Sequence, residues 1–341
     1  MPKSFSLPNT RASNDGPKIA VIIPCRDEAA TIAKVVTDFR RALPEAAIYV
    51  CDNNSTDGSA DLAKAAGAQV FAERLPGKGH VMRRMFSDVE ADVYFMVDGD
   101  DTYDHRGARD LMRHLEANSL DMVIGARVAA SDAAYRPGHR FGNVLLTRIV
   151  AFIFGNQVTD MLSGYRVFSR RFVKSFPALS TGFEIETELT IHALELRMPI
   201  DEIPLPYADR PEDSTSKLNT FRDGWRILRT ILLLAKEEKP LAFFSTIFGI
   251  LSLTATVLAW PLFVTFLETG LVPRFPTAIL VTGIMVLAFL SLGCGIILDT
   301  VTRGRRELRR LQYLGIPRSR SNIDADPQTL QDAAPLVKSS G

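Results

Sequence analysis

Two long stretches without any charged residue or histidine constrain this chain more than any other feature. They span residues 241–267 and 275–298, and each exceeds the ~20 residues that a helix needs to cross a bilayer. The seven residues between them are too few for a domain, so we expect a transmembrane hairpin with both ends on one side. A hairpin buried in a soluble core is the alternative. The positive-inside rule favours the membrane and places both basic flanks in the cytoplasm. These flanks contain Arg222, Arg226, Arg229, Lys236 and Lys239 before the hairpin, and Arg303, Arg305, Arg306, Arg309 and Arg310 after it.

The overall charge gives no argument for a nucleic-acid partner, because the formal net charge of the 341 residues is only +1. The three cysteines, Cys25, Cys51 and Cys294, are far apart. We therefore expect neither a disulfide framework nor a zinc site, in keeping with a reducing cytoplasm. Residues 1–17 lack the apolar core of a signal peptide, and we expect a disordered leader there. After the basic flank, residues 300–341 are expected to end in a disordered tail.

Residues 18–217 alternate between short apolar runs and helical patterns. Strands are predicted at 19–24, 47–51, 69–72 and 93–97, and helices at 28–42, 59–66 and 78–89. This alternation predicts an α/β domain with a mostly parallel sheet covered on both faces. Ligands of such sheets bind beyond the carboxyl ends of the strands. Polar clusters follow the first, second and fourth strands, so we expect the functional site at that edge.

The segment 218–239, between the domain and the hairpin, has the pattern of an amphipathic helix. Phe221, Trp225, Leu228 and Leu232 recur at helical spacing, with arginines toward the other side. Such a helix lies on a membrane surface or covers the sheet, and the sequence does not distinguish the two.

The sharpest polar signal is the run Asp98-Gly99-Asp100-Asp101, directly after the fourth predicted strand. Two carboxylates one residue apart at a strand end can face one Mg²⁺ or Mn²⁺ ion, which prefers oxygen ligands. Such an ion would bridge and neutralise a bound diphosphate. A solvated acidic turn is the alternative.

Three further loops offer ligand-binding candidates. Asp52 follows the second strand, whereas Ser55 or Asp57 in the same loop is better explained as the cap of the next helix. Glu28 follows the first strand. The loop Pro76-Gly77-Lys78-Gly79 leads into a helix and can approach a diphosphate closely, although it is no established phosphate-binding motif.

Taken in order, these motifs resemble the family 2 glycosyltransferases with a GT-A fold. The closer resemblance is to the polyisoprenyl-phosphate glycosyltransferases, which include dolichol-phosphate mannose synthase and bacterial relatives with a membrane hairpin. The resemblance rests on IAVIIPCRDE, DNNSTDGS, PGKGH, VDGDD, VIGAR, DMLSGYRVF, GFEIETEL and DRPEDSTSKLN, and runs from residue 18 to the second apolar stretch.

The resemblance implies a donor site and a metal site. Pro24, Glu28, Asp52 and Gly99 match positions that hold the nucleotide-sugar, with Lys78 and Gly79 beside them. Asp98 and Asp100 match the metal-binding carboxylates, Asp100 also being a catalytic candidate. Many relatives have Gln two residues further, where this chain has Thr102.

The resemblance also implies an acceptor site. Its candidates are Arg127, Arg140, Asp160, Ser163 and Arg166, with Gly164 in the same segment. A loop containing Arg210, Ser216 and Lys217 would close over both substrates, although Asp213 replaces the usual glycine. The catalytic candidates are therefore Asp100, Arg127, Arg140, Arg210 and Lys217. Among the glutamates of GFEIETEL, we expect Glu184 to face the site and the others to point elsewhere.

The residue types agree with a phosphate acceptor. A phosphate monoester, with a second pKa of ~6, is already a dianion at neutral pH. It needs orientation by arginines more than a general base. We therefore expect inverting transfer of a sugar from a UDP- or GDP-linked donor to a polyisoprenyl phosphate of the undecaprenyl type. The multi-pass protein would lie in a bacterial inner membrane, with a cytoplasmic catalytic domain and an open possibility of homo-oligomers. The alternatives are a processive polysaccharide synthase, which would need more membrane spans and a Q-x-x-R-W motif, and a non-catalytic nucleotide-binding membrane protein.

Overall fold

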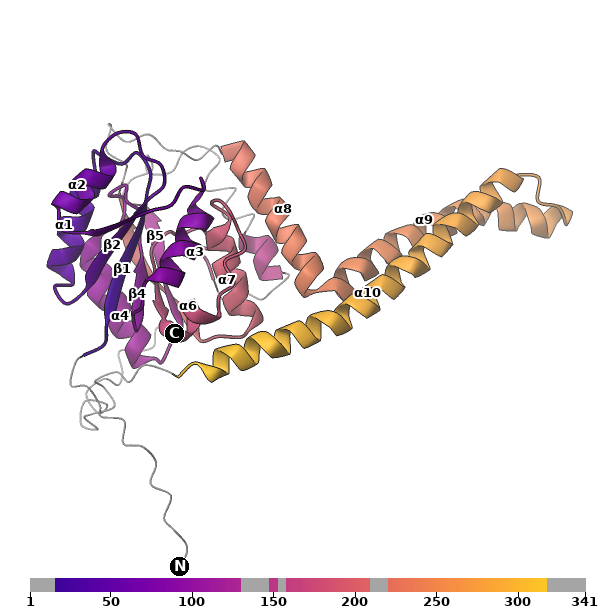
Figure 1. The fold of residues 1–341 in the computed structure, drawn as a ribbon. Coiled ribbons are helices and arrows are strands. Elements are labelled where there is room, and N and C mark those ends of the chain that lie inside the picture. The colour runs from indigo at the N-terminus through magenta and orange to yellow at the C-terminus, as the bar shows by residue number, and fades with distance from the viewer. Residues whose placement is uncertain (1–15, 130–146, 153–157, 209–219, 318–341) are drawn as a thin grey trace, which may run out of the picture.

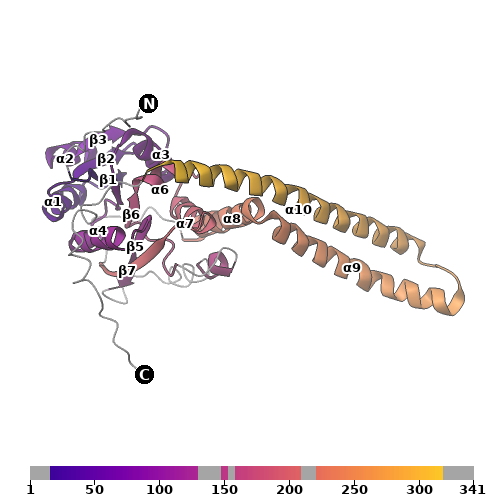
Figure 2. The same cartoon turned by 90° about the horizontal axis from the view of Figure 1, so that it is seen from below.

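The computed structural model describes residues 16–129, 147–152, 158–208 and 220–317, as an α/β domain from which a long helical hairpin projects (Figure 1). The domain confirms the expected fold class. The hairpin leaves on one side of the domain and returns to it (Figure 2).

The described residues of the domain form a seven-stranded sheet in the order β3-β2-β1-β4-β6-β5-β7. Only β6 runs antiparallel to its neighbours β4 and β5. The carboxyl ends of β1, β2, β4, β5 and β7 therefore meet at one edge, together with the chain that enters β6. The strands are β1 (Ile19–Cys25), β2 (Ala47–Asp52), β3 (Gln69–Ala72), β4 (Val93–Met96), β5 (Met122–Ala129), β6 (Arg166–Ser169) and β7 (Ile200–Tyr207).

Helices cover both faces of the sheet, and each face has its own apolar core. Alternate residues of a strand point to opposite faces, so Val21 packs in one core and Ile22 in the other. The first core is covered by α1 (Ile32–Ala42), α2 (Ser59–Ala65) and α4 (Ala108–Ala117), preceded by the 3-10 turn η1 (His105–Gly107). The second is covered by α3 (Lys78–Asp88), α6 (Arg170–Ser175) and α7 (Ile185–Glu195).

The first helix begins later than the predicted residue 28. Asp27 has a left-handed backbone conformation, with φ of 47°. The carbonyl of Glu28 then accepts hydrogen bonds from the amides of Thr31 and Ile32. A turn therefore separates β1 from α1, and this turn is part of the functional edge.

Helix α8 (Thr220–Glu238) covers the domain and keeps an exposed apolar side. Ile227, Ile231 and Ala235 are buried against the domain, whereas the side chain of Trp225 is 68% exposed. The side of α8 that faces the domain is therefore not the apolar side predicted from the sequence. Of the residues predicted for that side, Leu228 does pack against the core. The side chains of Phe221, Arg222 and Arg226 lie outside the described residues.

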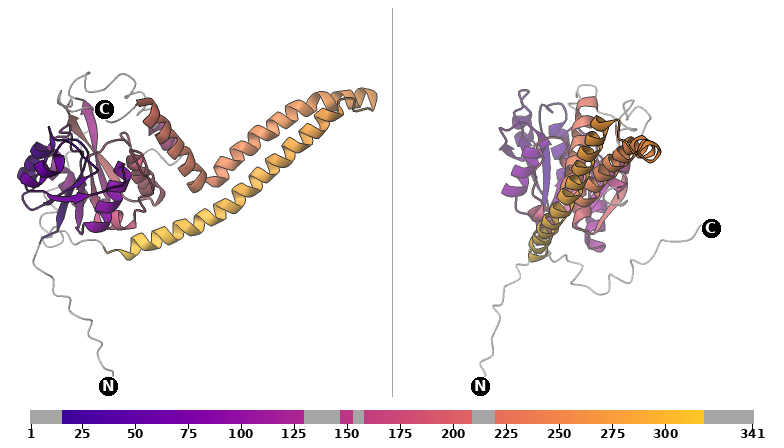
Figure 3. Two further views of the ribbon diagram at one scale, coloured as in Figure 1. Left: turned by 45° about the horizontal axis from the view of Figure 1, so that its top comes forward. Right: turned by 90° about the vertical axis from the view of Figure 1, so that its right-hand side faces the viewer.

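Helices α9 (Pro240–Thr269) and α10 (Phe275–Gly315) pack side by side along the hairpin (Figure 3). Both are long and apolar enough to cross a membrane, and little of their apolar stretches is buried. Gly295 lets the two helices approach closely, because a Cβ there would lie 2.9 Å from the Cβ of Phe244. The hydroxyl of Ser291 also donates to the carbonyl of Phe244, at 3.1 Å.

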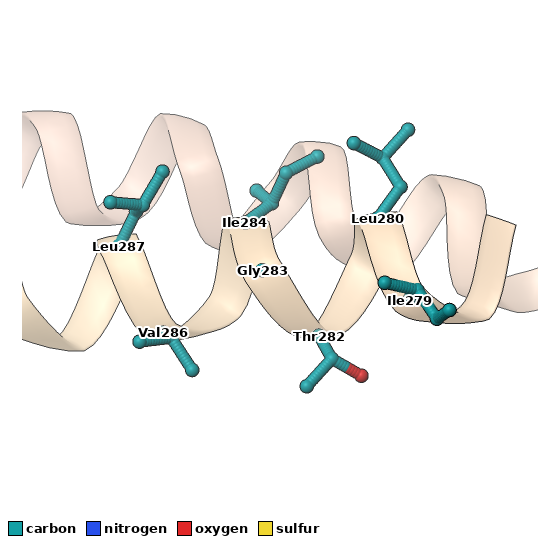
Figure 4. Close-up of a pocket in the computed structure, with 7 residues that line it drawn as sticks. All are labelled: Ile279, Leu280, Thr282, Gly283, Ile284, Val286 and Leu287. Carbon is teal, nitrogen blue, oxygen red and sulfur yellow. The ribbon is translucent and has the colours of Figure 1, made fainter. Parts of the chain in front are cut away.

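A shallow depression on α10 is lined only by uncharged side chains (Figure 4). Its residues run from Ile279 to Leu287, and Thr282 supplies the single hydroxyl group. The depression therefore offers no charge for binding a phosphate, and it belongs to the apolar surface of the hairpin.

The sequence predicted a basic segment from residue 300 and disorder beyond Arg310, and residues 311–315 are instead helical. Helix α10 continues without a break to Gly315 and returns to the domain beside α6 (Figures 1 and 2). Arg306 and Arg309 form ion pairs with the buried carboxylate of Glu195 at the end of α7. The buried Tyr313 donates its hydroxyl hydrogen to Asp121, at 2.5 Å. We call residues 300–315 the returning arm.

Candidate active site

The two carboxylates expected to hold a metal lie just beyond β4, at the shared carboxyl edge. Asp98 accepts a hydrogen bond from the ammonium of Lys78, with an Nζ–Oδ1 distance of 2.5 Å. Asp100 is almost completely buried, and its Oδ1 accepts from the hydroxyl of Thr102 at 2.6 Å. Thr102, the departure from the family pattern, therefore orients Asp100 in this structure.

The segment that precedes β6 packs tightly against Asp98. A Cβ at Gly164 would lie 2.2 Å from Oδ2 of Asp98, so only glycine allows this approach. The amide of Gly164 donates to the hydroxyl oxygen of Tyr103, at 2.7 Å. The structure thus brings DMLSGYR and DGDD together through backbone contacts that the two motifs do not reveal separately.

Lys78 lies between two carboxylates, Asp98 on one side and Glu186 on the other. Its side chain is 7% exposed. Burial opposes the charged form, but the carboxylates of Asp98 and Glu186 outweigh it and raise the pKa of Lys78. The lysine is therefore charged at neutral pH, and it links the loop after β3 to the metal candidate.

Glu186 is the glutamate of this segment that contacts Lys78, whereas the sequence favoured Glu184 as the one that faces the site. Glu184 and Glu188 instead bind backbone amides of residues 179–182. Residues four apart lie on the same side of a helix, and Glu184 and Glu188 do so at the start of α7.

The loops after β1, β2 and β3 are tied to one another by side-chain hydrogen bonds. Asp27 accepts from the amide of Thr56, and Ser59 accepts from the amide of Glu28. Asn53 donates to two carbonyls of the next loop and accepts from the amide of Gly77. This network fixes the donor-binding edge before any ligand binds.

The donor candidates from the sequence all lie along this edge. Pro24 is the second-last residue of β1 and lies opposite Cys51 of β2 in the parallel register. Glu28 is buried, and Asp52 ends β2 with its carboxylate 3.3 Å from the amide of Ser55. Gly99 is fixed by its carbonyl, which accepts from the hydroxyl of Thr31 at 2.7 Å.

The helix-capping interpretation of this region holds only in part. Ser55 accepts from the amide of Asp27 and does not cap α2. Asp57 accepts from the amide of Ser59, the first residue of α2, at 3.0 Å, and also from the amide of Ala29.

Arg127 and Asp160 meet at the end of β5. The guanidinium makes two hydrogen bonds of 2.7 Å to the carboxylate, and the aromatic ring of Tyr207 lies 5.5 Å from its central carbon. The side chains of Arg127 and Asp160 are 15% and 8% exposed. This fork geometry also suits a phosphate group, and Asp160 fixes Arg127 at the same edge of the sheet as Asp98 and Asp100.

Ser163 and Arg166 lie deeper than the sequence led us to expect. Ser163 donates to the carbonyl of Gly125, at 2.6 Å. The guanidinium of Arg166 is completely buried, with bonds to the carbonyl of Ser163 and the hydroxyl of Thr190. In this structure both residues are fully buried and hold the loop that contains Asp160 through hydrogen bonds.

Several predicted residues lie outside the described residues. These are Arg140, and in the expected closing loop Arg210, Asp213, Ser216 and Lys217.

Asp98 and Asp100 suit a divalent cation that a substrate helps to hold. Within the described residues, no group of three or more histidine, cysteine or acidic side chains could hold a metal alone. Two carboxylates at a strand end, with open positions for diphosphate oxygens, match the coordination habits of Mg²⁺. The donor set therefore fits a metal bound together with a nucleotide diphosphate.

Sequence reasoning missed three residues of the site. Glu186 had a signal, because it is one of the three glutamates of GFEIETEL that were weighed as site residues. Tyr103 and Asn53 had none, since each acts by holding a loop that is distant in sequence.

Comparison with known proteins agrees with this geometry. Residues 20–176 match the model of "Glycosyl transferase family 2". The glycosyltransferase AglJ of Haloferax volcanii is 36% identical over 254 residues, which are 73% of this chain and 81% of AglJ. A dolichyl-phosphate hexose transferase of the same organism is 27% identical over 222 residues, 65% of this chain and 95% of that protein. The chain therefore belongs to glycosyltransferase family 2, and it is an enzyme of the hexosyltransferase type.

Solved structures agree on the fold. Glucosyl-3-phosphoglycerate synthase from Mycobacterium tuberculosis, solved with Mn²⁺, UDP-glucose and phosphoglyceric acid, superposes with a TM-score of 0.54 at 21% identity. The superposition covers 64% of this chain and 80% of that one. The fold is thus GT-A.

Proposed function

We propose that this glycosyltransferase moves a hexose from a nucleoside-diphosphate sugar to a polyisoprenyl phosphate at the cytoplasmic face of a bacterial inner membrane. The observation that carries the proposal is that Asp98, Asp100 and Arg127 lie at the carboxyl ends of β4 and β5, at one edge of a sheet whose domain is continuous with an apolar hairpin. The hexose transferase relative, which is named for dolichyl phosphate, supports the same acceptor class.

On the donor side, Asp98 and Asp100 would hold Mg²⁺ or Mn²⁺. When bound, such an ion supplies positive charge to the departing diphosphate. Glu28 and Asp52 lie where nucleoside hydroxyl or base groups would sit, at the ends of β1 and β2. The glycine-rich loop of Lys78 contacts Asn53, next to Asp52, through the amide of Gly77, and it contacts Asp98 through the ammonium of Lys78.

On the acceptor side, an oxygen of the phosphate dianion attacks the anomeric carbon. The bond from that carbon to the diphosphate breaks, and the nucleoside diphosphate leaves with inversion of configuration. Arg127, fixed by Asp160, would compensate the phosphate charge. No proton has to be removed from a phosphate that is already a dianion.

The hairpin explains why a soluble fold is tethered. A polyisoprenyl phosphate keeps its chain in the bilayer and its phosphate at the headgroup level. The α9–α10 pair would keep the site near that plane, and exposed basic residues before and after it, such as Arg229 and Arg310, would each contribute about 1 kcal/mol near an anionic surface.

The proposal is tested with the full-length enzyme in detergent, undecaprenyl phosphate and a panel of radiolabelled UDP- and GDP-hexoses. We expect one donor to label an acid-labile lipid, with loss of label in EDTA. Asp100→Asn should lower turnover on the order of 100-fold, since the carboxylate charge is needed for the metal. Undiminished turnover in EDTA would refute the metal assignment, and donor consumption that ignores the lipid would refute the acceptor assignment.

A further inference from the structure

The ammonium of Lys78 forms an ion pair with Asp98, one of the two carboxylates that would bind the proposed metal. Its Nζ lies 2.5 Å from Oδ1 of Asp98 and also contacts Oε1 of Glu186. Lys78 and Glu186 are almost completely buried, whereas the side chain of Asp98 is 28% exposed. One buried cation therefore has two partners, and only the more exposed one belongs to the metal pair.

The backbone holds Lys78 and Glu186 in place relative to each other. A Cβ at Gly77 would lie 2.1 Å from the carbonyl oxygen of Thr181, and one at Gly79 would lie 2.2 Å from that of Ser180. The loop before α3 thus packs directly on the loop before α7. Glu184 and Glu188 bind the amides of that second loop and keep it at the start of α7.

A lysine ammonium and a divalent cation repel each other and compete for the same carboxylate. If Asp98 were the only counter-ion of Lys78, binding a metal would leave a buried positive charge without a partner, which is costly. Glu186 removes this conflict because it provides a second, deeper carboxylate that the ammonium already contacts.

We propose that Glu186 is a positioning residue that holds Lys78 when a divalent cation takes over Asp98. Asp98 thus exchanges the ammonium for the cation, and Lys78 stays in the site, bound to Glu186. This inference rests on the metal site of the proposed function.

The test measures the affinity of the full-length protein for Mn²⁺ alone, by electron paramagnetic resonance of the free ion. Glu186→Gln should weaken Mn²⁺ binding about tenfold, the size of coupling found between neighbouring charged groups. Glu90→Gln is the control, because Glu90 is an exposed carboxylate before the start of β4, at the opposite end of that strand from Asp98, and pairs only with Arg170 and Lys174 among the ion pairs of the described residues. It should leave the Mn²⁺ affinity unchanged.

A double variant separates positioning from a merely structural role. In Glu186→Gln with Lys78→Met no ammonium competes for Asp98, so Mn²⁺ affinity should return at least to the wild-type value. Lys78→Met alone should bind Mn²⁺ more tightly than wild type, and this holds as a test even if Glu186→Gln fails to fold.

Three results would overturn the inference: wild-type Mn²⁺ affinity in Glu186→Gln, no recovery in the double variant, or no gain in Lys78→Met. If the wild-type protein itself binds no Mn²⁺, the metal site of the proposed function fails, and the inference fails with it. If the wild-type protein binds Mn²⁺ and Glu186→Gln binds it equally well, this inference is rejected but the metal site of the proposed function is not.

Discussion

Arg127 has two tasks that can be measured separately. Its guanidinium neutralises the buried carboxylate of Asp160 and is the candidate contact for the acceptor phosphate. Arg127→Ala should therefore destabilise the protein by about 3 kcal/mol, as expected when one partner of a buried ion pair is lost, and should also weaken use of the lipid acceptor.

The double variant Arg127→Ala with Asp160→Asn distinguishes the two effects. Removing the carboxylate charge should restore much of the melting temperature, but it should not restore the KM for the acceptor. Recovery of both would mean that Arg127 acts only on stability. If calorimetry showed an equal loss of nucleotide affinity, Arg127 would belong to the donor site.

His192 is a second residue with a measurable signature. It is buried beside the rings of Phe172 and Phe176, with the hydroxyl of Ser175 at 3.5 Å. Burial and the nearby Arg309 lower its pKa to about 3, against a smaller opposite effect of Glu238. The folded protein thus keeps this imidazole neutral at pH values where the unfolded chain binds a proton.

The consequence is a loss of stability on acidification. Above pH ~6.5 the histidine makes no difference, and between that pH and about 3 stability should fall by up to ~1.4 kcal/mol per pH unit. We measure the free energy of unfolding by denaturant at several pH values between 7 and 5. In His192→Gln the slope of this free energy against pH should be smaller by up to the contribution of one bound proton. An unchanged slope would show that other groups cause the acid sensitivity.

At the scale of elements, the returning arm is the feature that the sequence least revealed. Its arginines carry the same signal as solvated membrane flanks. The partners of Arg309, Glu195 and Glu238, and the partner of Tyr313, Asp121, are distant in sequence. The strands β1 to β4 were predictable within a residue or two because local apolar runs define them. The docking of α10 depends on tertiary contacts, which periodicity alone does not contain.

The arm should contribute to the stability of the catalytic domain. Arg309 bridges Glu195 and Glu238, both nearly completely buried, at 2.8 Å each. Arg309→Ala should lower the melting temperature in detergent by about 5 °C or more. Tyr313→Phe should have a smaller effect, about 1.5 kcal/mol, since Arg171 and Ser169 still bind Asp121.

Arg310→Ala is the matched control, because Arg310 has the same charge on the same helix but is exposed. It should leave the melting temperature within a degree or so of wild type. Equal shifts for Arg309→Ala and Arg310→Ala would mean that the arm does not dock in solution.

At the scale of the whole molecule, the catalytic domain and the hairpin share one core. Ile231 of α8 and Tyr313 of α10 are buried in the same cluster as Met82 and Phe168. Cutting the chain after Lys217 would therefore expose core surface as well as remove the two candidate membrane-spanning helices. The role of the hairpin is better tested by changing the acceptor and keeping the full chain.

The sequence predicted the edge where the site lies and most of its residues, because motifs at strand ends of a parallel sheet converge by topology. It did not predict which side chains contact each other there. The ion pair of Glu186 with Lys78 and the close approach of Gly164 to Asp98 each depend on how two loops pack against each other. Such contacts join residues that are far apart in the chain and have no local pattern.

The most direct test of the account is the dependence of turnover on how the acceptor is presented. The full-length enzyme is reconstituted in vesicles that contain undecaprenyl phosphate, and transfer of labelled hexose to lipid is measured. The account predicts that the rate follows the mole fraction of acceptor in the bilayer, at constant bulk concentration, and is much lower with a short water-soluble prenyl phosphate. A rate that follows only the bulk concentration, and is equal for both acceptors, would contradict it.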